Sequence, residues 1–209
     1  MYKPIYRYDI EQNSDEWLEI KIGKFSASNS APLLMDKNTK GYTGLINKII
    51  EERLTGLPCE NDSFKGNAFT NRGHEFEPIA RNDFEIDTLQ VVNLVGVVEL
   101  NDWVLCSPDG LINDDKLHQI KCPIFSTQRK YLELVKNGKC PIDTNYYKQM
   151  QFELFVTQRE SNIFTSFHPK LKRIDYVLKR DEKMISFIET RLSEAKKEVL
   201  EQIQIIKNY

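Results

Sequence analysis

The sequence SPDGL at residues 107–111 is followed, ten residues after its aspartate, by QIKCP at residues 119–123. The apolar, β-branched residues around these two segments predict strands, and the polar residues 113–115 predict a turn between them. A hairpin of this kind places Asp109 and Lys121 side by side at one end. These residues therefore indicate both a sheet in the middle of the fold and a cluster of polar side chains at its edge.

The chemistry of this cluster follows from its side chains. Side chains alternate along a strand, so Gln119 and Lys121 share one face and Ile120 lies on the other. A carboxylate such as Asp109 suits Mg²⁺, a bound metal polarises phosphate and activates water, and a lysine stabilises charge or helps to deprotonate the water. The pattern predicts metal-dependent phosphodiester hydrolysis, although the neutral Gln119 stands where a glutamate is expected.

The overall composition is that of an ordinary globular protein. The 209 residues are 40% hydrophobic and 29% charged, with a net charge of −2, and suffice for a substantial core. The charge argues against a uniformly basic nucleic-acid binder, but acidic metal ligands can offset a local basic groove. No apolar run approaches 18 residues and no signal-peptide core is present, which predicts a cytoplasmic, intracellular protein that does not contact membranes. No two cysteines are spaced as Cys-x-x-Cys, which argues against disulfides. The histidines are too scattered along the chain to form a zinc site of the usual spacing.

The predicted elements form a single domain covering residues 1–209. It has a helical part at about 14–90, a sheet core at about 91–180 and a C-terminal helix at about 181–207. Helices first, a sheet in the middle and interleaved helices afterwards indicate an α/β (α+β) fold, in which a central mixed β-sheet is flanked by helices. Ser14 is the predicted N-cap of the first helix.

Hydrophobic spacing places the other elements. A helix at 67–84 is predicted to bury Phe76, Ile79, Ala80 and Phe84. That orientation leaves Glu77 and Arg81 one turn apart on a neighbouring face. The remaining predictions are a helix at 43–54, a loop at 55–63, helices at 127–135 and about 144–156, and strands at 163–167 and 174–178.

Five motifs occur in one order between about residues 14 and 180. They are KIGKFSAS at 21–28, preceded by Trp17; GHEFE at 73–77; SPDGL at 107–111; QIKCP at 119–123; and YYKQMQ at 146–151. The ordered set resembles the bacteriophage lambda exonuclease and YqaJ-type viral recombinase family of the PD-(D/E)XK nuclease superfamily. The first motif is similar to that family's Arg-x-Gly-x-x-Thr-Ala-Ser segment, and the last matches its Tyr-x-x-Gln-x-Gln helix.

The resemblance implies a restriction-endonuclease-like core and a specific activity. The expected protein is a Mg²⁺-dependent 5′→3′ exonuclease that degrades one strand of double-stranded DNA from an end. Mn²⁺ would substitute for Mg²⁺, and Ca²⁺ would bind without supporting catalysis. The resemblance also implies a ring-shaped homotrimer and a single-strand annealing partner in phage-type homologous recombination. Two alternatives remain: a catalytically silent protein that binds DNA ends, and a restriction-type endonuclease that needs no 5′-phosphate pocket.

The resemblance assigns roles to particular residues. The expected catalytic residues are Asp109, Gln119, Lys121, Glu77 and Gln149. The expected metal ligands are Asp109, Gln119 and the main-chain carbonyl of Ile120. The residues expected to bind DNA or its 5′-phosphate are Lys21, Ser26, Ser28, Ser107, Trp17, Tyr146 and Gln151.

For several of these residues, a purely structural role is an alternative to the functional role that the resemblance implies. Asp109 could be a turn residue that follows a proline, and Glu77 could be a surface glutamate paired with Arg81. Trp17 could be a buried helix residue. The polar face of a packed helix is an alternative for Gln149 and fits Gln151 better. Lysine is also a weaker, non-bidentate substitute for the arginine of the family's phosphate pocket.

Gln119 is the departure from the family pattern. A neutral amide keeps one oxygen of the glutamate shape, but it loses the charge and can turn its NH₂ group toward a metal. Either the chain carries an engineered Glu→Gln change, or this homologue has diverged. The isosteric exchange within an otherwise intact motif set favours engineering. The chain as given is therefore predicted to be inactive or strongly impaired.

Overall fold

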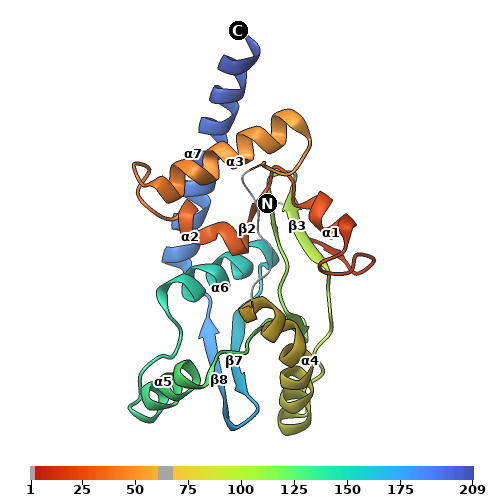
Figure 1. Cartoon of the computed structure of the whole chain (residues 1–209), viewed down its shortest axis with the longest axis vertical. Helices are drawn as coiled ribbons and strands as arrows, with labels where there is room; N and C mark the ends of the chain where they lie inside the picture. Colours follow the sequence, from red (N-terminus) through yellow and green to blue (C-terminus); the bar gives the residue numbers. More distant parts are fainter. Residues whose placement is uncertain (1–2, 61–67) are drawn as a thin grey trace.

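The computed structural model describes residues 3–60 and 68–209 and, in the helix that begins at residue 68, the side chains from residue 72 onward. Figure 1 shows how the elements are arranged. In chain order they are β1 (Ile5–Arg7), α1 (Asp15–Ile20), β2 (Phe25–Ser26), the 3₁₀ helix η1 (Ala27–Asn29), α2 (Ser30–Leu33), α3 (Lys40–Thr55), α4 (Ala68–Thr88), β3 (Val97–Asn101), β4 (Val104–Cys106), β5 (Gly110–Ile112), β6 (Lys116–Lys121), α5 (Phe125–Lys136), α6 (Thr144–Thr157), β7 (Ser161–His168), β8 (Leu171–Lys179) and α7 (Glu182–Lys207).

The described strands form two four-stranded sheets, with the orders β1-β3-β4-β2 and β5-β6-β7-β8. Each sheet mixes parallel and antiparallel pairs, which confirms the predicted mixed α/β fold. The division into two sheets differs from the single central sheet that was expected. Pro108 lies between β4 and β5 and has no N–H to donate to a ladder. An isolated bridge between Asn93 and Leu111 ties β5 to the segment before β3.

The predicted hairpin is present as β5 and β6. Gly110 lies opposite His118 and Ile112 lies opposite Lys116. Asn113 opens the turn at φ 49°, in the left-handed region that asparagine tolerates better than most residues. On its other side, β6 pairs in parallel with β7, whose residues are all buried. The hairpin is thus held inside the second sheet.

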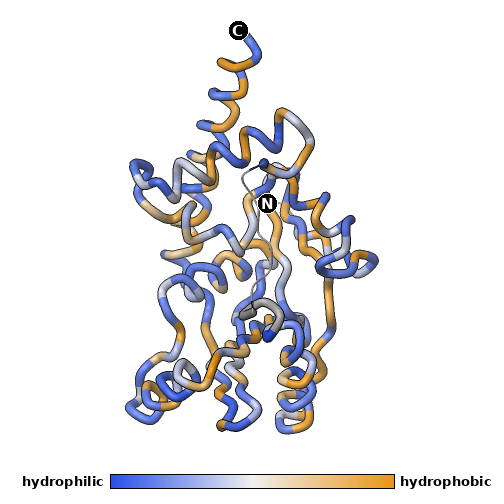
Figure 2. The backbone as a smooth tube through the Cα atoms, in the orientation of Figure 1, coloured by the Kyte–Doolittle hydropathy of each residue, from blue (hydrophilic) through white to orange (hydrophobic). Residues whose placement is uncertain are grey.

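The largest hydrophobic cluster joins all three predicted parts of the chain. It contains Phe25 from β2, Ile49 from α3, Phe152 from α6 and Ile188 from α7, each 0% exposed. Apolar and polar stretches alternate along α7 in Figure 2, as expected for a helix with one buried face. None of the described helices has the length and apolar character needed to cross a membrane.

Helix α4 covers β6 and β7 with one face. Ala80 packs against Ile120, and Phe84, four residues later, packs against Ile163. The prediction that Ile79 is also buried was wrong, because its side chain is 51% exposed. Each helix residue is rotated by about 100° from the previous one, so Ile79 lies beside the stripe that runs through Ala80 and Phe84.

Some local features match the predictions and others lie beyond them. Ser14 caps α1 by accepting a hydrogen bond from the Trp17 backbone N–H. The region predicted as helical, at about 14–90, also holds the short strand β2, which pairs in parallel with β4. A two-residue strand is too short for hydrophobic periodicity to detect. Residues 61–63 of the predicted loop, and residue 67 of the predicted helix, lie outside the described residues.

Candidate active site

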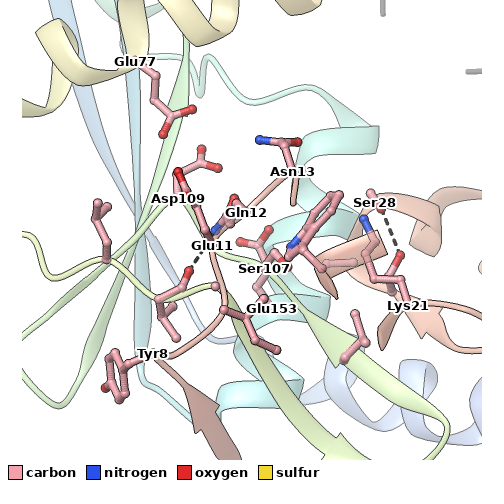
Figure 3. Close-up of a pocket in the computed structure, with 18 of the residues that line it drawn as sticks. Tyr8, Glu11, Gln12, Asn13, Lys21, Ser28, Glu77, Ser107, Asp109 and Glu153 are labelled. Atoms are coloured by element: carbon pink, nitrogen blue, oxygen red, sulfur yellow. Dashed lines mark hydrogen bonds between the residues drawn. The ribbon is translucent and has the colours of Figure 1, made fainter. Parts of the chain in front are cut away.

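Two adjoining pockets meet at the end of the β5–β6 hairpin, with volumes of about 550 Å³ and about 650 Å³. Both are lined by His74 and Glu77 of α4 and by Asp109 of the β4–β5 connection. The first pocket, drawn in Figure 3, continues to Lys21 at the end of α1. The second continues along β6 to Lys121. The acidic residues therefore stand at the junction of the two pockets.

Asp109 is fixed in place by the neighbouring strand. Its Oδ2 accepts hydrogen bonds from the Gln119 side-chain amide at 2.5 Å and from the Ile120 backbone N–H at 2.6 Å. Burial raises the pKa of the Asp109 carboxyl, while the positive charge of Lys121 opposes this shift. The hairpin thus brings Asp109 and Lys121 close enough for the charge of each to shift the pKa of the other. The sequence pattern predicted that the two residues lie side by side.

Glu77 faces Asp109 from α4 (Figure 3). Its Oε1 accepts a hydrogen bond from Arg81 Nη2 at 2.6 Å, so the pairing with Arg81 that was considered as a structural alternative is formed. Burial, and next the negative charge of Asp109, raise the pKa of Glu77 to about 7. The ion pair does not remove Glu77 from the pocket, because the residue still lines both cavities.

Lys121 stays protonated in this setting. Burial alone would lower the pKa of its ammonium group, but the nearby negative charges, led by Asp109, outweigh burial and raise the pKa. Its Nζ lies 5.2 Å from the centroid of the Tyr146 ring on α6. A lysine with a raised pKa suits the stabilisation of negative charge better than the removal of a proton from water.

Gln119 is part of a chain of side-chain hydrogen bonds. Its NH₂ group donates to Asp109, and its Oε1 accepts from Gln149 Nε2 at 3.1 Å. The same Gln149 nitrogen also lies 3.1 Å from Glu153 Oε1, to which it donates. Gln119 is only 1% exposed. The amide at position 119 therefore donates a hydrogen bond to one oxygen of Asp109. An ionised carboxylate at this position would have no hydrogen atom to donate.

Glu153 was not selected by the sequence analysis. It lies on α6, has no exposed surface and borders the first pocket. Burial, followed by the charge of Asp109, raises its pKa to about 8. Its spacing of four residues from Gln149 could have identified it, because residues i and i+4 share a helix face.

The far end of the first pocket holds the residues expected to bind a 5′-phosphate. Trp17 donates from Nε1 to Ser107 Oγ at 2.9 Å, and Lys21 Nζ lies 3.4 Å from the centroid of the Trp17 ring. The Ser26 and Ser28 hydroxyl groups lie 2.9 Å apart. All five residues line this pocket. Trp17 is only partly buried, so the alternative of a fully buried helix tryptophan does not hold.

The other expected site residues divide between the second pocket and the protein interior. Ile120 and Tyr146 line the second pocket. The expected role of Gln151 in DNA binding was wrong, because its side chain is 0% exposed. Its amide donates to the Lys179 carbonyl and accepts from the Asp181 backbone N–H. These bonds join α6 to the start of α7, which is the structural alternative considered for this residue.

The oxygen-rich junction is compatible with a hard divalent cation. Asp109 and Glu77 bring two carboxylates together, and burial raises the pKa of each. A cation would favour the charged form of both groups. Within residues 3–60 and 68–209, no group of three histidine, cysteine, aspartate or glutamate residues is arranged to hold a metal ion. The neutral Gln119 leaves the strand one carboxylate short, so any cation here would also need amide or carbonyl oxygens.

The motif order along the chain can be compared with known protein families. The model of the YqaJ-like viral recombinase domain matches residues 16–160. The chain belongs to this family. The family match covers α1 through α6 and therefore includes every side chain discussed at the two pockets.

Solved structures similar to this YqaJ-like protein include nucleases. The alkaline exonuclease LHK-Exo from Laribacter hongkongensis is 31% identical, with a TM-score of 0.79, and the match covers 93% of this chain and 97% of that one. The same enzyme in complex with dAMP gives 30% identity and a TM-score of 0.80, with the same coverage.

A phage-related exonuclease from Haemophilus somnus 129PT is 15% identical, with a TM-score of 0.65 over 88% of this chain and 96% of that one. At this identity the match supports the fold alone. No curated protein matches the chain. Family and fold together confirm the predicted nuclease fold and support a nuclease role for this YqaJ-like protein.

Proposed function

We propose that this YqaJ-like protein is a Mg²⁺-dependent 5′→3′ exonuclease that digests one strand of duplex DNA from its ends. The observation that carries the proposal is the junction at Asp109 and Glu77. From this junction one pocket leads to Lys121, and the other leads to Lys21 and its neighbouring hydroxyl groups. Such an arrangement suits a scissile phosphodiester beside the carboxylates and a terminal phosphate held further along the groove.

Each residue has a role in the proposed reaction. Asp109, Glu77 and the Ile120 carbonyl would hold Mg²⁺. The Gln119 side-chain oxygen would join them once its amide turns over, because its NH₂ group now faces Asp109. When bound, Mg²⁺ would supply polarisation of the phosphodiester and activation of water. Lys121, kept protonated by the surrounding carboxylates, would stabilise negative charge that develops on the phosphate. Gln149 would orient groups near the cation through its side-chain amide.

Lys21, Ser26, Ser28 and Ser107 form the proposed 5′-phosphate pocket. An ammonium group provides charge, and hydroxyl groups donate hydrogen bonds to phosphate oxygens. Trp17 lies between Ser107 and Lys21, and its partly buried ring offers a face on which a terminal base could stack. Tyr146 would contact DNA from the second pocket.

Digestion of defined DNA substrates tests this proposal. We expect the Gln119→Glu variant to convert linear duplex DNA with 5′-phosphates into single strands with Mg²⁺ or Mn²⁺, more slowly with 5′-hydroxyl ends, and not with Ca²⁺. The parent chain should do so at a strongly reduced rate. The Gln119→Glu variant is included because the neutral amide would lower the rate of the parent chain. Covalently closed circular duplex should stay intact, because it offers no end.

Each alternative function has its own outcome. Efficient cutting of closed circles would favour a restriction-type endonuclease over an exonuclease. Binding to DNA ends without digestion by either the parent chain or Gln119→Glu would favour the catalytically silent protein. Digestion from the 3′ end, observed with a strand labelled at one terminus, would contradict the proposed direction.

We also propose the wider context that the family resemblance implies. The protein would act as a ring-shaped homotrimer that encircles DNA, and the single strand that it leaves would pass to an annealing partner during phage-type recombination. Because the substrate is DNA, the protein would work inside the cell. Membership of the YqaJ-like family supports this part of the proposal.

A further inference from the structure

Glu153 is a buried carboxylate beside the candidate active site. It lies on α6, is 0% exposed and borders the pocket that contains Asp109. Its two oxygens accept hydrogen bonds from Gln149 Nε2 at 3.1 Å and from Asn162 Nδ2 at 2.8 Å. Both donors are neutral amides, which orient a carboxylate without cancelling its charge. Burial of a carboxylate is costly unless a cation or a proton compensates the charge.

Asn162 on β7 is oriented so that its side-chain amide donates a hydrogen bond to the Glu153 carboxylate. Asn162 is fully buried, and its side-chain oxygen has no hydrogen-bond partner among the described residues. The opposite orientation of the amide would direct that oxygen at Glu153 and separate the hydrogen-bonded pair. The Asn162 side chain therefore donates a hydrogen bond to Glu153 at the cost of leaving its own oxygen without a donor. This orientation is expected if the group at position 153 acts as a hydrogen-bond acceptor.

Hydrogen bonds link Glu153 to the position where the family pattern expects a glutamate. Gln149 donates both to Glu153 and to Gln119, and Gln119 in turn donates to Asp109. The charge of Asp109 also acts on Glu153. Figure 3 shows Glu153 on the wall of the same pocket as Asp109 and Ser107. The carboxylate absent from β6 therefore has a counterpart on α6, one amide away.

We propose that Glu153 supplies the acidic charge that Gln119 lacks, and that it acts on the cation site through the Gln149 side-chain amide, which donates to both Glu153 and Gln119, rather than by direct contact with the cation. This inference rests on the proposed nuclease function and names a further residue for the same site. The affinity of a site for a hard cation depends on the charge and the oxygen atoms around the cation, and not on which helix or strand carries those atoms. The exchange would give a diverged homologue a working site and would make Gln119 a native residue.

A set of four proteins tests the inference: the parent chain, Glu153→Gln, Gln119→Glu, and the double variant with both changes. The double variant returns the carboxylate to β6 and has the same total charge as the parent. A buried amide at position 153 is tolerable, because the Asn162 side chain can turn its free oxygen toward the new NH₂ group. Glu198→Gln on α7 is the matched control, because Glu198 accepts a hydrogen bond from Tyr42 and lies outside both pockets.

The first measurement is Ca²⁺ binding by calorimetry, which does not depend on activity. We expect Glu153→Gln to weaken Ca²⁺ binding by about 10-fold or more and the double variant to restore it. The second measurement is Mg²⁺-dependent digestion of 5′-phosphorylated duplex. Here Glu153→Gln should lower the rate by roughly 100-fold, and the double variant should recover most of that loss. Glu198→Gln should match the parent in both assays.

The outcomes separate this inference from the proposed function. If Gln119→Glu digests DNA while Glu153→Gln equals the parent in Ca²⁺ affinity and rate, the nuclease proposal holds and Glu153 is only a buried structural acid. If no variant digests DNA, the nuclease proposal fails, and the Ca²⁺ titrations still decide whether Glu153 contributes to a cation site. Failure of the double variant to recover Ca²⁺ binding would also overturn the inference.

Discussion

At the scale of single residues, the ammonium group of Lys21 is held in the first pocket by contact with the Trp17 ring. Its ammonium group lies 3.4 Å from the centroid of the Trp17 ring, and the ring donates a hydrogen bond to Ser107 at the other end. A cation over an aromatic face is held by the ring quadrupole. The charge is thus positioned in the pocket.

We predict that Lys21→Ala weakens binding to 5′-phosphorylated duplex ends. Each neutralised phosphate releases counterions, so the slope of log affinity against log salt should become shallower by about one unit or less. Labelled duplex titrated over a range of salt concentrations, with Ca²⁺ present, measures both quantities. Lys197→Ala on α7 is the control, because the Lys197 side chain is 78% exposed and lies outside both pockets. Equal slopes for the parent and Lys21→Ala would exclude Lys21 from phosphate binding.

At the scale of an element, the start of α7 depends on a charged cap. Asp181 Oδ1 accepts from the backbone N–H groups of Lys183 and Met184, and Oδ2 accepts from the Tyr147 hydroxyl at 2.6 Å. The Tyr147 hydrogen bond, followed by the bond from Met184, lowers the pKa of Asp181. The buried Gln151 binds the Asp181 backbone N–H, so α6 positions the cap of α7.

We predict that Asp181→Ala lowers the melting temperature at neutral pH and that the difference shrinks in acid. A carboxyl whose pKa is lower in the folded state stabilises the protein above its unfolded-state pKa. That contribution disappears as the pH falls through the folded-state value. Melting curves of both proteins between neutral pH and about pH 2, below the reference aspartate pKa, measure the effect. Asp181→Asn should keep part of the cap without the pH dependence, and a pH-independent difference for Asp181→Ala would contradict the charge argument.

At the scale of the whole molecule, Arg159 ties the two sheets together. It follows α6 and is 7% exposed, and its Nη1 donates to the carbonyls of Asn113 and Lys116 at 2.8 and 2.7 Å. These carbonyls belong to the β5–β6 turn and to the start of β6 in the second sheet. The guanidinium also lies 5.7 Å from the ring of Tyr6 on β1, at the edge of the first sheet. One buried side chain thus spans the division between the sheets.

We predict that Arg159→Ala lowers the free energy of unfolding by about 3 kcal/mol, because it removes a buried side chain and leaves partly buried carbonyl groups without donors. Urea denaturation measures this change. The control is Arg129→Ala on α5, where the guanidinium is 68% exposed and 3.8 Å from Glu133, and the expected change is below about 0.5 kcal/mol. A similar, small effect for both variants would show that Arg159 does not hold the sheets together.

The parts of the fold that the sequence determined are those controlled by near neighbours. The hairpin that joins Asp109 to Lys121 follows from alternating strand residues and a turn that asparagine can open. The Ser14 cap follows from one hydroxyl group and the backbone next to it. These features involve few residues that are close in sequence, so local pattern and turn chemistry suffice to specify them.

Only the tertiary structure decided the features that depend on distant elements. Helical spacing could not separate the exposed Ile79 from the buried Ala80, because the packing partner of α4 sets the width of its buried stripe. The same spacing placed Gln151 on a polar face, but contacts with the β8–α7 junction bury it. Glu153 becomes a candidate contributor to cation binding only because α6 places it and Gln149 beside Gln119 and Asp109. Sequence alone determines which side chains are available and their local geometry, whereas packing between distant segments determines their burial, their charge and the groups that they face.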